Sequence, residues 1–206
     1  MTDPYVIRSE DDLNKIYAPP DADIIAGIKT SLHEFHVNYI QNASFVCIGS
    51  AADNMFDVSP RGGEAGFIHV IDSKTIAIPD WRGNNKIETI RNIIRNGHVG
   101  LLFLFQGLNF FFRANGAAEV TTNPKLLAAM ARDGKEPITA IRISINQIYL
   151  HCGKAVMRSK LWRESSHMKS KDLPSLAKMV KEFTKIEASE EAIEENNETM
   201  LRDRLY

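Results

Sequence analysis

The stretch DVSPRGGEAGFIHVID, residues 57–72, contains the pattern that decides the fold. Its polar and apolar residues alternate as in a half-buried β-strand, stop at residues 59–63, and then alternate again. The interruption reads Ser-Pro-Arg-Gly-Gly, and proline and glycine at such a position predict a turn between two strands. Arg61 stands in the middle of that predicted turn. A turn needs only the proline and the glycines, so the presence of an arginine at this position calls for a further explanation.

The pattern extends on both sides of this stretch. Short segments rich in β-branched and aromatic residues, separated by turn residues, are predicted as strands. They are residues 44–51, 56–60, 66–72, 75–79, 98–105, 109–121, 140–147 and 148–153. A tight hairpin is expected at residues 72–74. Helices are predicted at residues 84–96 and at residues 123–134. The first carries an apolar stripe of Ile87, Ile90 and Ile94, with Ile93 partly on the same face. Because strands and helices do not alternate strictly, we expect a mainly β (α+β) protein built on an antiparallel barrel.

The two ends of the chain read as helices around this barrel. Residues 1–43 contain a helix that starts at a Ser9 cap and a second helical pattern over residues 21–42. Residues 153–206 are first basic, then amphipathic, then acidic, and the acidic run is interpreted as a solvated helix face. The 206 residues therefore form one predicted domain, with N-terminal helices at 1–43, the barrel at 44–152 and C-terminal helices at 153–206.

Composition excludes several classes of function. The net charge is −1, which argues against a nucleic-acid partner. The acidic start does not resemble a signal peptide, and the apolar run at residues 99–112 is too broken to span a bilayer. With two cysteines in strand-like segments, we expect a cytoplasmic protein without membrane contact. His33 and His36 have no carboxylate-rich partner segment, so no metal site is predicted, and no residue is assigned a catalytic role.

Three groups of residues suit an anion. Ser59 and Arg61 combine a hydroxyl with a guanidinium that can hold a phosphate by two parallel bonds, beside glycines that let backbone amides converge. Arg82 and Lys86 flank a predicted helix start, where a cation opposes the helix dipole unless an anion is bound. Lys154 and Arg158 share a face of a helix, where like charges repel. For each group, ordinary solvation of the charged side chains is the alternative.

Taken together, these residues resemble a known family. The segment DVSPRGGEAGFIHVIDSKTIAIPDWRGNNKIETIRNIIRNGHVGLLFLFQG, with RANGAAEV and HCGKAVMRSKLW, is similar to the flavin-binding proteins related to pyridoxamine 5′-phosphate oxidase. The resemblance runs from about residue 45 to residue 162. It implies a six-stranded antiparallel split β-barrel and a homodimer that holds FMN in two equivalent clefts at the interface. The FMN-binding positions it implies are Val58, Ser59, Arg61, Ile78, Pro79, Asp80, Arg82, Asn84, Asn85 and Lys86, with Lys154, Arg158 and Trp162 from either subunit.

The resemblance implies an FMN-dependent oxidoreductase acting on a small molecule. The oxidase proper carries a tryptophan followed by an Arg-x-His element that grips its vitamin substrate, and Trp162 here is followed by RESSHMKSKDL. We therefore do not expect pyridoxamine phosphate as the substrate. The alternatives are a non-catalytic flavin-binding or redox-sensing protein, a split barrel that uses a deazaflavin or nicotinamide donor, and a haem-binding barrel with His69 or His151 as ligand.

A dimer is also indicated by the residues themselves. The runs VGLLFLF, residues 99–105, and NFFF, residues 109–112, are almost continuously apolar, which is typical of strands covered on both faces. One face would fill the barrel, and a second copy of the chain or the flanking helices would cover the other.

Overall fold

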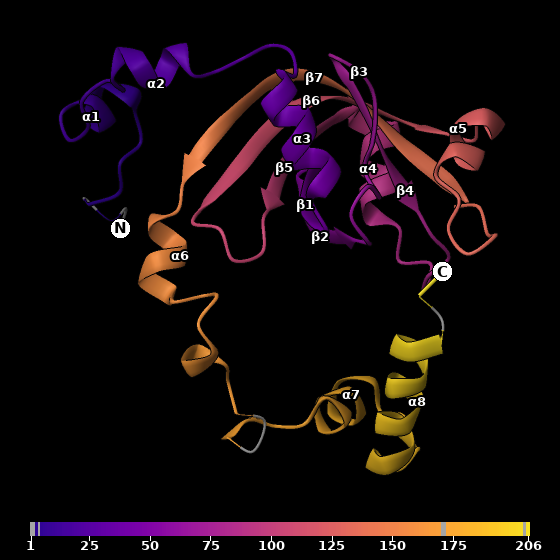
Figure 1. Cartoon of the computed structure of the whole chain (residues 1–206). Helices are drawn as coiled ribbons and strands as arrows, with labels where there is room; N and C mark the ends of the chain where they lie inside the picture. Colours follow the sequence, from indigo (N-terminus) through magenta and orange to yellow (C-terminus); the bar gives the residue numbers. More distant parts are fainter. Residues whose placement is uncertain (1–2, 4, 170–171, 204) are drawn as a thin grey trace.

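The computed structural model describes residues 3, 5–169, 172–203 and 205–206, and it is built around one antiparallel sheet (Figure 1). The sheet has seven strands in the order β2-β1-β5-β6-β7-β4-β3. In chain order they are β1 Phe45–Ala52, β2 Met55–Gly62, β3 His69–Asp72, β4 Thr75–Asp80, β5 His98–Leu104, β6 Phe110–Thr121 and β7 Thr139–Cys152. The predicted antiparallel, mainly β architecture is confirmed, but six strands is the wrong count because the short β3 adds an edge strand to β4. The sheet is not closed, since its outermost strands β2 and β3 do not pair with each other.

Burial alternates along the strands and defines one inner face. In β1 the buried residues are Val46, Ile48, Ser50 and Ala52, with partly exposed residues between them. The same inner face includes Phe103 of β5, which is completely buried. Each large apolar side chain of this kind contributes about 1.5–3 kcal/mol by leaving water, so this face supplies most of the stabilisation of the fold.

Strand β2 corrects the predicted turn. It runs from Met55 through Gly62 without interruption, so Pro60 and Arg61 lie within the strand. A proline is tolerated in a sheet on an edge strand, where its missing N–H faces the open side, and β2 is an edge strand. The chain turns only afterwards, where the Phe67 amide donates to the Glu64 carbonyl at 3.0 Å.

Gly63 has a different role from the predicted one, which was to let backbone amides converge on an anion. A Cβ on Gly63 would lie 2.7 Å from the Cβ of Phe67, and the Gly63 amide donates to the Ser44 carbonyl at 3.1 Å. Gly63 is therefore required by close packing against a buried phenylalanine. The expected convergence of its amide on a bound anion is wrong, because that amide already has a partner.

Three helices pack on the sheet: α3 Glu34–Asn42, α4 Glu88–Asn96 and α5 Pro124–Ala129. The predicted stripe on α4 is corrected in part, since Ile90 and Ile93 are buried whereas Ile94 is 72% exposed. The helix ends at Gly97, whose φ of 70° suits glycine. Figure 1 shows α3 and α4 beside the strands of the sheet.

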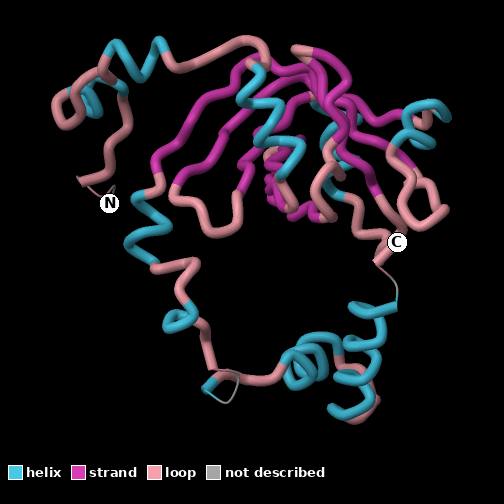
Figure 2. The backbone as a smooth tube through the Cα atoms, in the orientation of Figure 1, coloured by secondary structure: helices cyan, strands magenta, loops and turns pink. Residues whose placement is uncertain are grey.

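The helices near the two ends of the chain do not form a layer around the barrel. They are α1 Glu10–Asn14, α2 Ala22–Ala26, α6 Lys154–Ser159, a 3-10 turn at Glu164–Ser166, α7 Leu176–Thr184 and α8 Glu190–Asp203. Helices α1, α2 and α8 bury no residue, and Figures 1 and 2 show α7 and α8 apart from the sheet. The single helical pattern expected over residues 21–42 is broken, because Lys29 pairs with Ile148 of β7 as an isolated bridge. None of the helices in the described part of the chain is long and apolar enough to cross a membrane.

Candidate functional site

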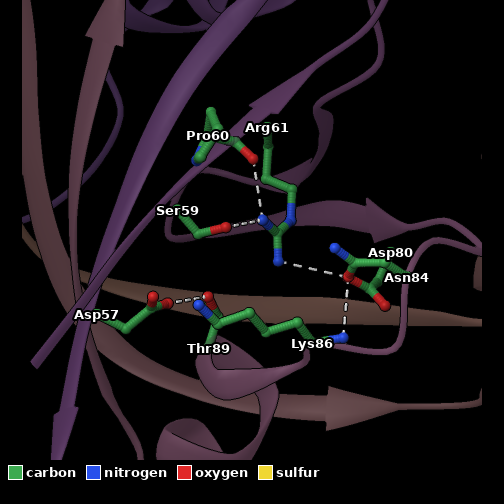
Figure 3. Close-up of polar contacts among 8 residues, drawn as sticks. All are labelled: Asp57, Ser59, Pro60, Arg61, Asp80, Asn84, Lys86 and Thr89. Carbon is green, nitrogen blue, oxygen red and sulfur yellow. Dashed lines mark hydrogen bonds and ion pairs between the residues drawn. The ribbon is translucent and has the colours of Figure 1, made fainter. Parts of the chain in front are cut away.

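A cleft of about 460 Å³ lies between β2, β4 and the segment that leads into α4. In the sheet, four strands separate β2 from β4, so the two strands meet only because the sheet curls round on itself. An ion pair between Arg61 of β2 and Asp80 of β4, 3.4 Å long, spans the opening (Figure 3). The cleft is therefore the seam of an unclosed barrel, crossed by side chains and not by a backbone ladder.

The structure brings together most of the predicted site residues from three separate segments. The eight that line the cleft are Val58, Ser59, Arg61, Pro79, Asp80, Asn84, Asn85 and Lys86. Ser59 and Arg61 are two residues apart on a strand, so they face the same side. Pro79 and Asp80 are the last two residues of β4, and the remaining three belong to the loop before α4.

Arg61 is the most constrained charge in the cleft. Its guanidinium donates to the hydroxyl of Ser59, to the Pro60 carbonyl at 2.9 Å and to the Asp80 carboxylate. The Arg61 and Asp80 side chains are only 19% and 17% exposed. The guanidinium is thus held in position and largely removed from solvent, which strengthens its interaction with an anionic group.

The same environment changes the pKa of the Asp80 carboxyl. Burial raises the pKa of the Asp80 carboxyl above its ordinary value of 3.8, and the neighbouring Arg61 offsets part of that rise. The net direction is upward, so desolvation of the carboxylate outweighs its attraction to the guanidinium. The guanidinium donates to the Ser59 hydroxyl and the Pro60 carbonyl as well as to Asp80, so its position in the cleft is fixed by more than the ion pair.

The loop before α4 forms the opposite wall. The side-chain oxygen of Asn84 accepts from the Lys86 amide at 3.0 Å, and Asn85 adopts a left-handed conformation with φ of 63°. The helix begins at Glu88, later than the predicted start near residues 84–85. Its N-cap, Ile87, offers no side-chain hydrogen bond, so the first-turn amides beside the cleft have no cap.

Sequence reasoning missed several residues of the cleft. The Asp57 carboxylate accepts from the Thr89 hydroxyl at 2.6 Å, which ties β2 to α4. Strand alternation places Asp57 on the same face as Ser59, so that signal was present. Ile138 also lines the cleft, and its amide donates to the Asp80 carbonyl at 3.0 Å, a contact that only the tertiary fold reveals.

Other predicted residues lie elsewhere within one protomer. Ile78 is completely buried in the core and is not one of the residues that line the cleft, so its contact with a flavin stays a prediction. Arg82 is exposed next to the lining residues without being one of them. Lys154 and Arg158 are exposed on α6, and the Trp162 indole donates to the Leu108 carbonyl at 2.8 Å, so these three do not join the cleft of their own chain.

The histidines considered as haem ligands are also outside the cleft. His69 lies on β3, and His151 lies at the end of β7 beside Phe111. Among residues 3, 5–169, 172–203 and 205–206, no group of three or more His, Cys, Asp or Glu side chains is placed to hold a metal ion.

Fold and site together define an open antiparallel barrel with a polar cleft at its seam. Residues 32–152 match the sequence pattern of the pyridoxamine 5′-phosphate oxidase family, and the chain belongs to that family. This assignment confirms the resemblance drawn from the residues.

Solved structures are similar over 58–60% of the chain. A tagged variant of HupZ from Group A Streptococcus is 16% identical, with 58% of this chain and 98% of that chain covered and a TM-score of 0.47. A Lactobacillus delbrueckii protein provisionally described as a pyridoxamine 5′-phosphate oxidase is 21% identical, with 59% and 95% covered and a TM-score of 0.46. The FAD binding protein of Mycobacterium smegmatis is 17% identical, with 60% and 97% covered and a TM-score of 0.41. A search of curated proteins gave no match.

Proposed function

We propose that the chain is an FMN-dependent oxidoreductase that holds the flavin in the cleft between β2, β4 and the start of α4. The observation that carries this proposal is the mostly buried guanidinium of Arg61, fixed by Ser59 and Asp80 and facing the loop of Asn84 to Lys86. Membership of the pyridoxamine 5′-phosphate oxidase family supports a flavin phosphate as the group that this arrangement takes.

The residues present fit such a group. The cleft volume lies within the range of about 300–1,000 Å³ that is usual for small-molecule sites. Arg61, Lys86 and the uncapped amides at the start of α4 are the groups suited to a phosphate. Among the lining residues, Ile87 and Ile138 have exposed side chains that offer apolar surface for a planar ring. The carboxylates of Asp57 and Asp80 oppose an anion, but each is already engaged, by Thr89 and Arg61 respectively.

Bound FMN would supply hydride or single-electron transfer. The residues of the chain bind and orient it: Arg61 and Lys86 neutralise charge, and Asp57 holds α4 against β2 through Thr89. The Arg-x-His element of the vitamin oxidase is missing after Trp162, so the proposed substrate is a small molecule other than pyridoxamine phosphate.

A homodimer belongs to this proposal. On the outward face of β2, Phe56 is 84% and Val58 73% exposed, and Val58 is also a lining residue of the cleft. In the strand register Val58 lies opposite Gly49, which lies opposite Gly100, so this face is flat and open to close approach. A second copy placed here would cover the exposed apolar side chains and complete the cleft wall. Lys154, Arg158 and Trp162 are then proposed to reach the partner's cleft.

A titration tests the proposal. Purified protein is titrated with FMN and, separately, with riboflavin, and binding is followed by quenching of flavin fluorescence. We expect FMN to bind at least tenfold more tightly, because only FMN carries the phosphate that Arg61 contacts. Equal affinities would refute the assigned site. Bleaching of the bound flavin by NADH or NADPH, with recovery in air, supports the oxidoreductase, whereas FMN binding without reduction by any donor would leave a flavin-binding protein.

A further inference from the structure

The protein exposes more surface than a compact monomer of this size. It has 14,812 Å² of accessible surface, whereas a folded monomer of 23.2 kDa exposes about 9,700 Å². The excess of about 5,000 Å² is several times the area of about 800 Å² that one partner contributes to a standard interface. A chain with this much surplus surface is expected to bury it against another molecule.

Most side chains of the segment after the sheet are exposed, and this segment, here called the C-terminal arm, comprises residues 153–169 and 172–203. Helices α7 and α8 of the arm pack on each other. Of their side chains only Ala177 is buried, and Phe183 of α7 is 79% exposed. Two short helices without a core of their own are not stable alone, so the arm requires an external apolar surface.

The charges of the arm indicate what that surface belongs to. Residues 153–169 contain five Lys or Arg and one Glu, whereas residues 187–198 contain six Glu and no Lys or Arg. In a two-fold dimer the same surface occurs on both subunits, so a contact between segment i and segment j occurs twice. An arm with a basic half and an acidic half is complementary to a second copy of itself in such an arrangement.

We propose that the C-terminal arm embraces a second copy of this chain, with the apolar side of α7 seated on the partner and the acidic α8 facing the cations at positions 160, 163 and 169 of the partner, which follow the residues proposed to reach the flavin cleft. This inference extends the proposed homodimer, and it assigns to the arm the task of holding the two subunits together. The exposed side chains of β2 provide apolar surface for the same partner.

Isotope-mixed cross-linking tests the position of the arm. Chains labelled with ¹⁴N and ¹⁵N are mixed under conditions that allow subunit exchange, treated with a lysine-reactive cross-linker, and analysed by mass spectrometry. We expect links from Lys178, Lys181 and Lys185 of α7 to join chains of different label. Links confined to one label would show that α7 seats on its own chain, and would overturn the proposal.

A variant of the full chain tests the energetics. Phe183→Ser is expected to raise the dimer dissociation constant at least tenfold, measured by sedimentation velocity over a dilution series. Lys178→Ser, at an exposed position on the same helix, is the matched control and should change it less than twofold. An unchanged constant for Phe183→Ser, or a wild-type chain that stays monomeric, would contradict the proposal.

Failure of the proposed arm contact can be distinguished from failure of the proposed flavin binding. Cross-links between chains without any FMN binding would leave the arm contact standing and remove the proposed function. Tight FMN binding by a dimer in which α7 links only to its own chain would remove the arm contact alone.

Discussion

Replacement of Arg61 by alanine separates the two roles of this residue, which pairs with Asp80 and is proposed to bind a phosphate. The guanidinium and the Asp80 carboxylate are each about one-fifth exposed and 3.4 Å apart. Breaking a fully buried pair by removing one partner costs about 3–5 kcal/mol. Because this pair is longer than an optimal one and partly solvated, we expect Arg61→Ala to lower the free energy of unfolding by about 1–2 kcal/mol.

The pH dependence of that loss follows from Asp80. Its pKa is already raised by burial, and Arg61→Ala removes the group that partly offsets the rise. A raised pKa in the folded state means that stability is intact below the unfolded value of about 3.8 and is lost as pH rises through the folded value. The variant is therefore expected to differ most from wild type near pH 7 and least near pH 4, measured by urea unfolding of the flavin-free protein at fixed concentration.

A second substitution isolates the flavin contribution. Arg61→Ala should weaken FMN binding by about 1.5–3 kcal/mol, or about 10- to 150-fold, because it removes a charge-assisted contact. Adding Asp80→Asn removes the unpaired carboxylate, so the double variant should regain most of the lost stability and little of the lost affinity. Arg95→Ala, which breaks the exposed pair with Asp53, is the control and should change both quantities only slightly. The reasoning is refuted if Arg61→Ala binds FMN as wild type does, or if stability and affinity recover together in the double variant.

Three further predictions concern single residues other than Arg61 and Asp80. Ile78→Ala should lower the free energy of unfolding by about 2–5 kcal/mol, because the side chain is fully buried. The folded fraction should keep its FMN affinity, and a loss of affinity would show that Ile78 belongs to the flavin site. Gly63→Ala should cost about 1–3 kcal/mol in urea unfolding because of the contact with Phe67, whereas Gly83→Ala, which would meet nothing within 4 Å, should cost less than about 0.5 kcal/mol. Leu102 is half-buried on the outward face of β5, and Leu102→Glu should shift the proposed dimer toward monomer in light scattering. A stable dimer with unchanged melting would count against that face as the interface.

The strands could be predicted from the sequence because their signal is local. Alternation and β-branched residues located the strand segments of the sheet, including the hairpin of β3 and β4. Residues 140–147 and 148–153, predicted as two strands, instead form the single strand β7. The path of β2 through Pro60 could not be predicted, because tolerance of a proline depends on whether the strand lies at an edge of the sheet. The late start of α4 has a similar cause, since Asn84 and Asn85 form a turn in place of the first helical residues.

The site was predictable only in part for a related reason. Arg61 and Asp80 were both predicted as site residues. Their contact with each other could not be predicted, because it depends on the curl of the whole sheet. Ile78 was assigned to the flavin site on the family resemblance, and residues 76–79 of β4 are all buried. Where both faces of a strand are covered, alternation cannot tell which side chain points to a ligand.

The open seam follows from residues that prevent closure of the sheet. Closing the barrel would require backbone hydrogen bonds between β2, at one end of the sheet, and β4 or β3 at the other end. Pro60 lacks the N–H that such a ladder needs, and β3 covers β4 for only four residues. The gap is spanned instead by the side chains of Arg61 and Asp80, which reach further than a backbone hydrogen bond and leave room between the strands. Pro60 therefore helps to keep the barrel open, and the next residue, Arg61, places its guanidinium in the cleft that results.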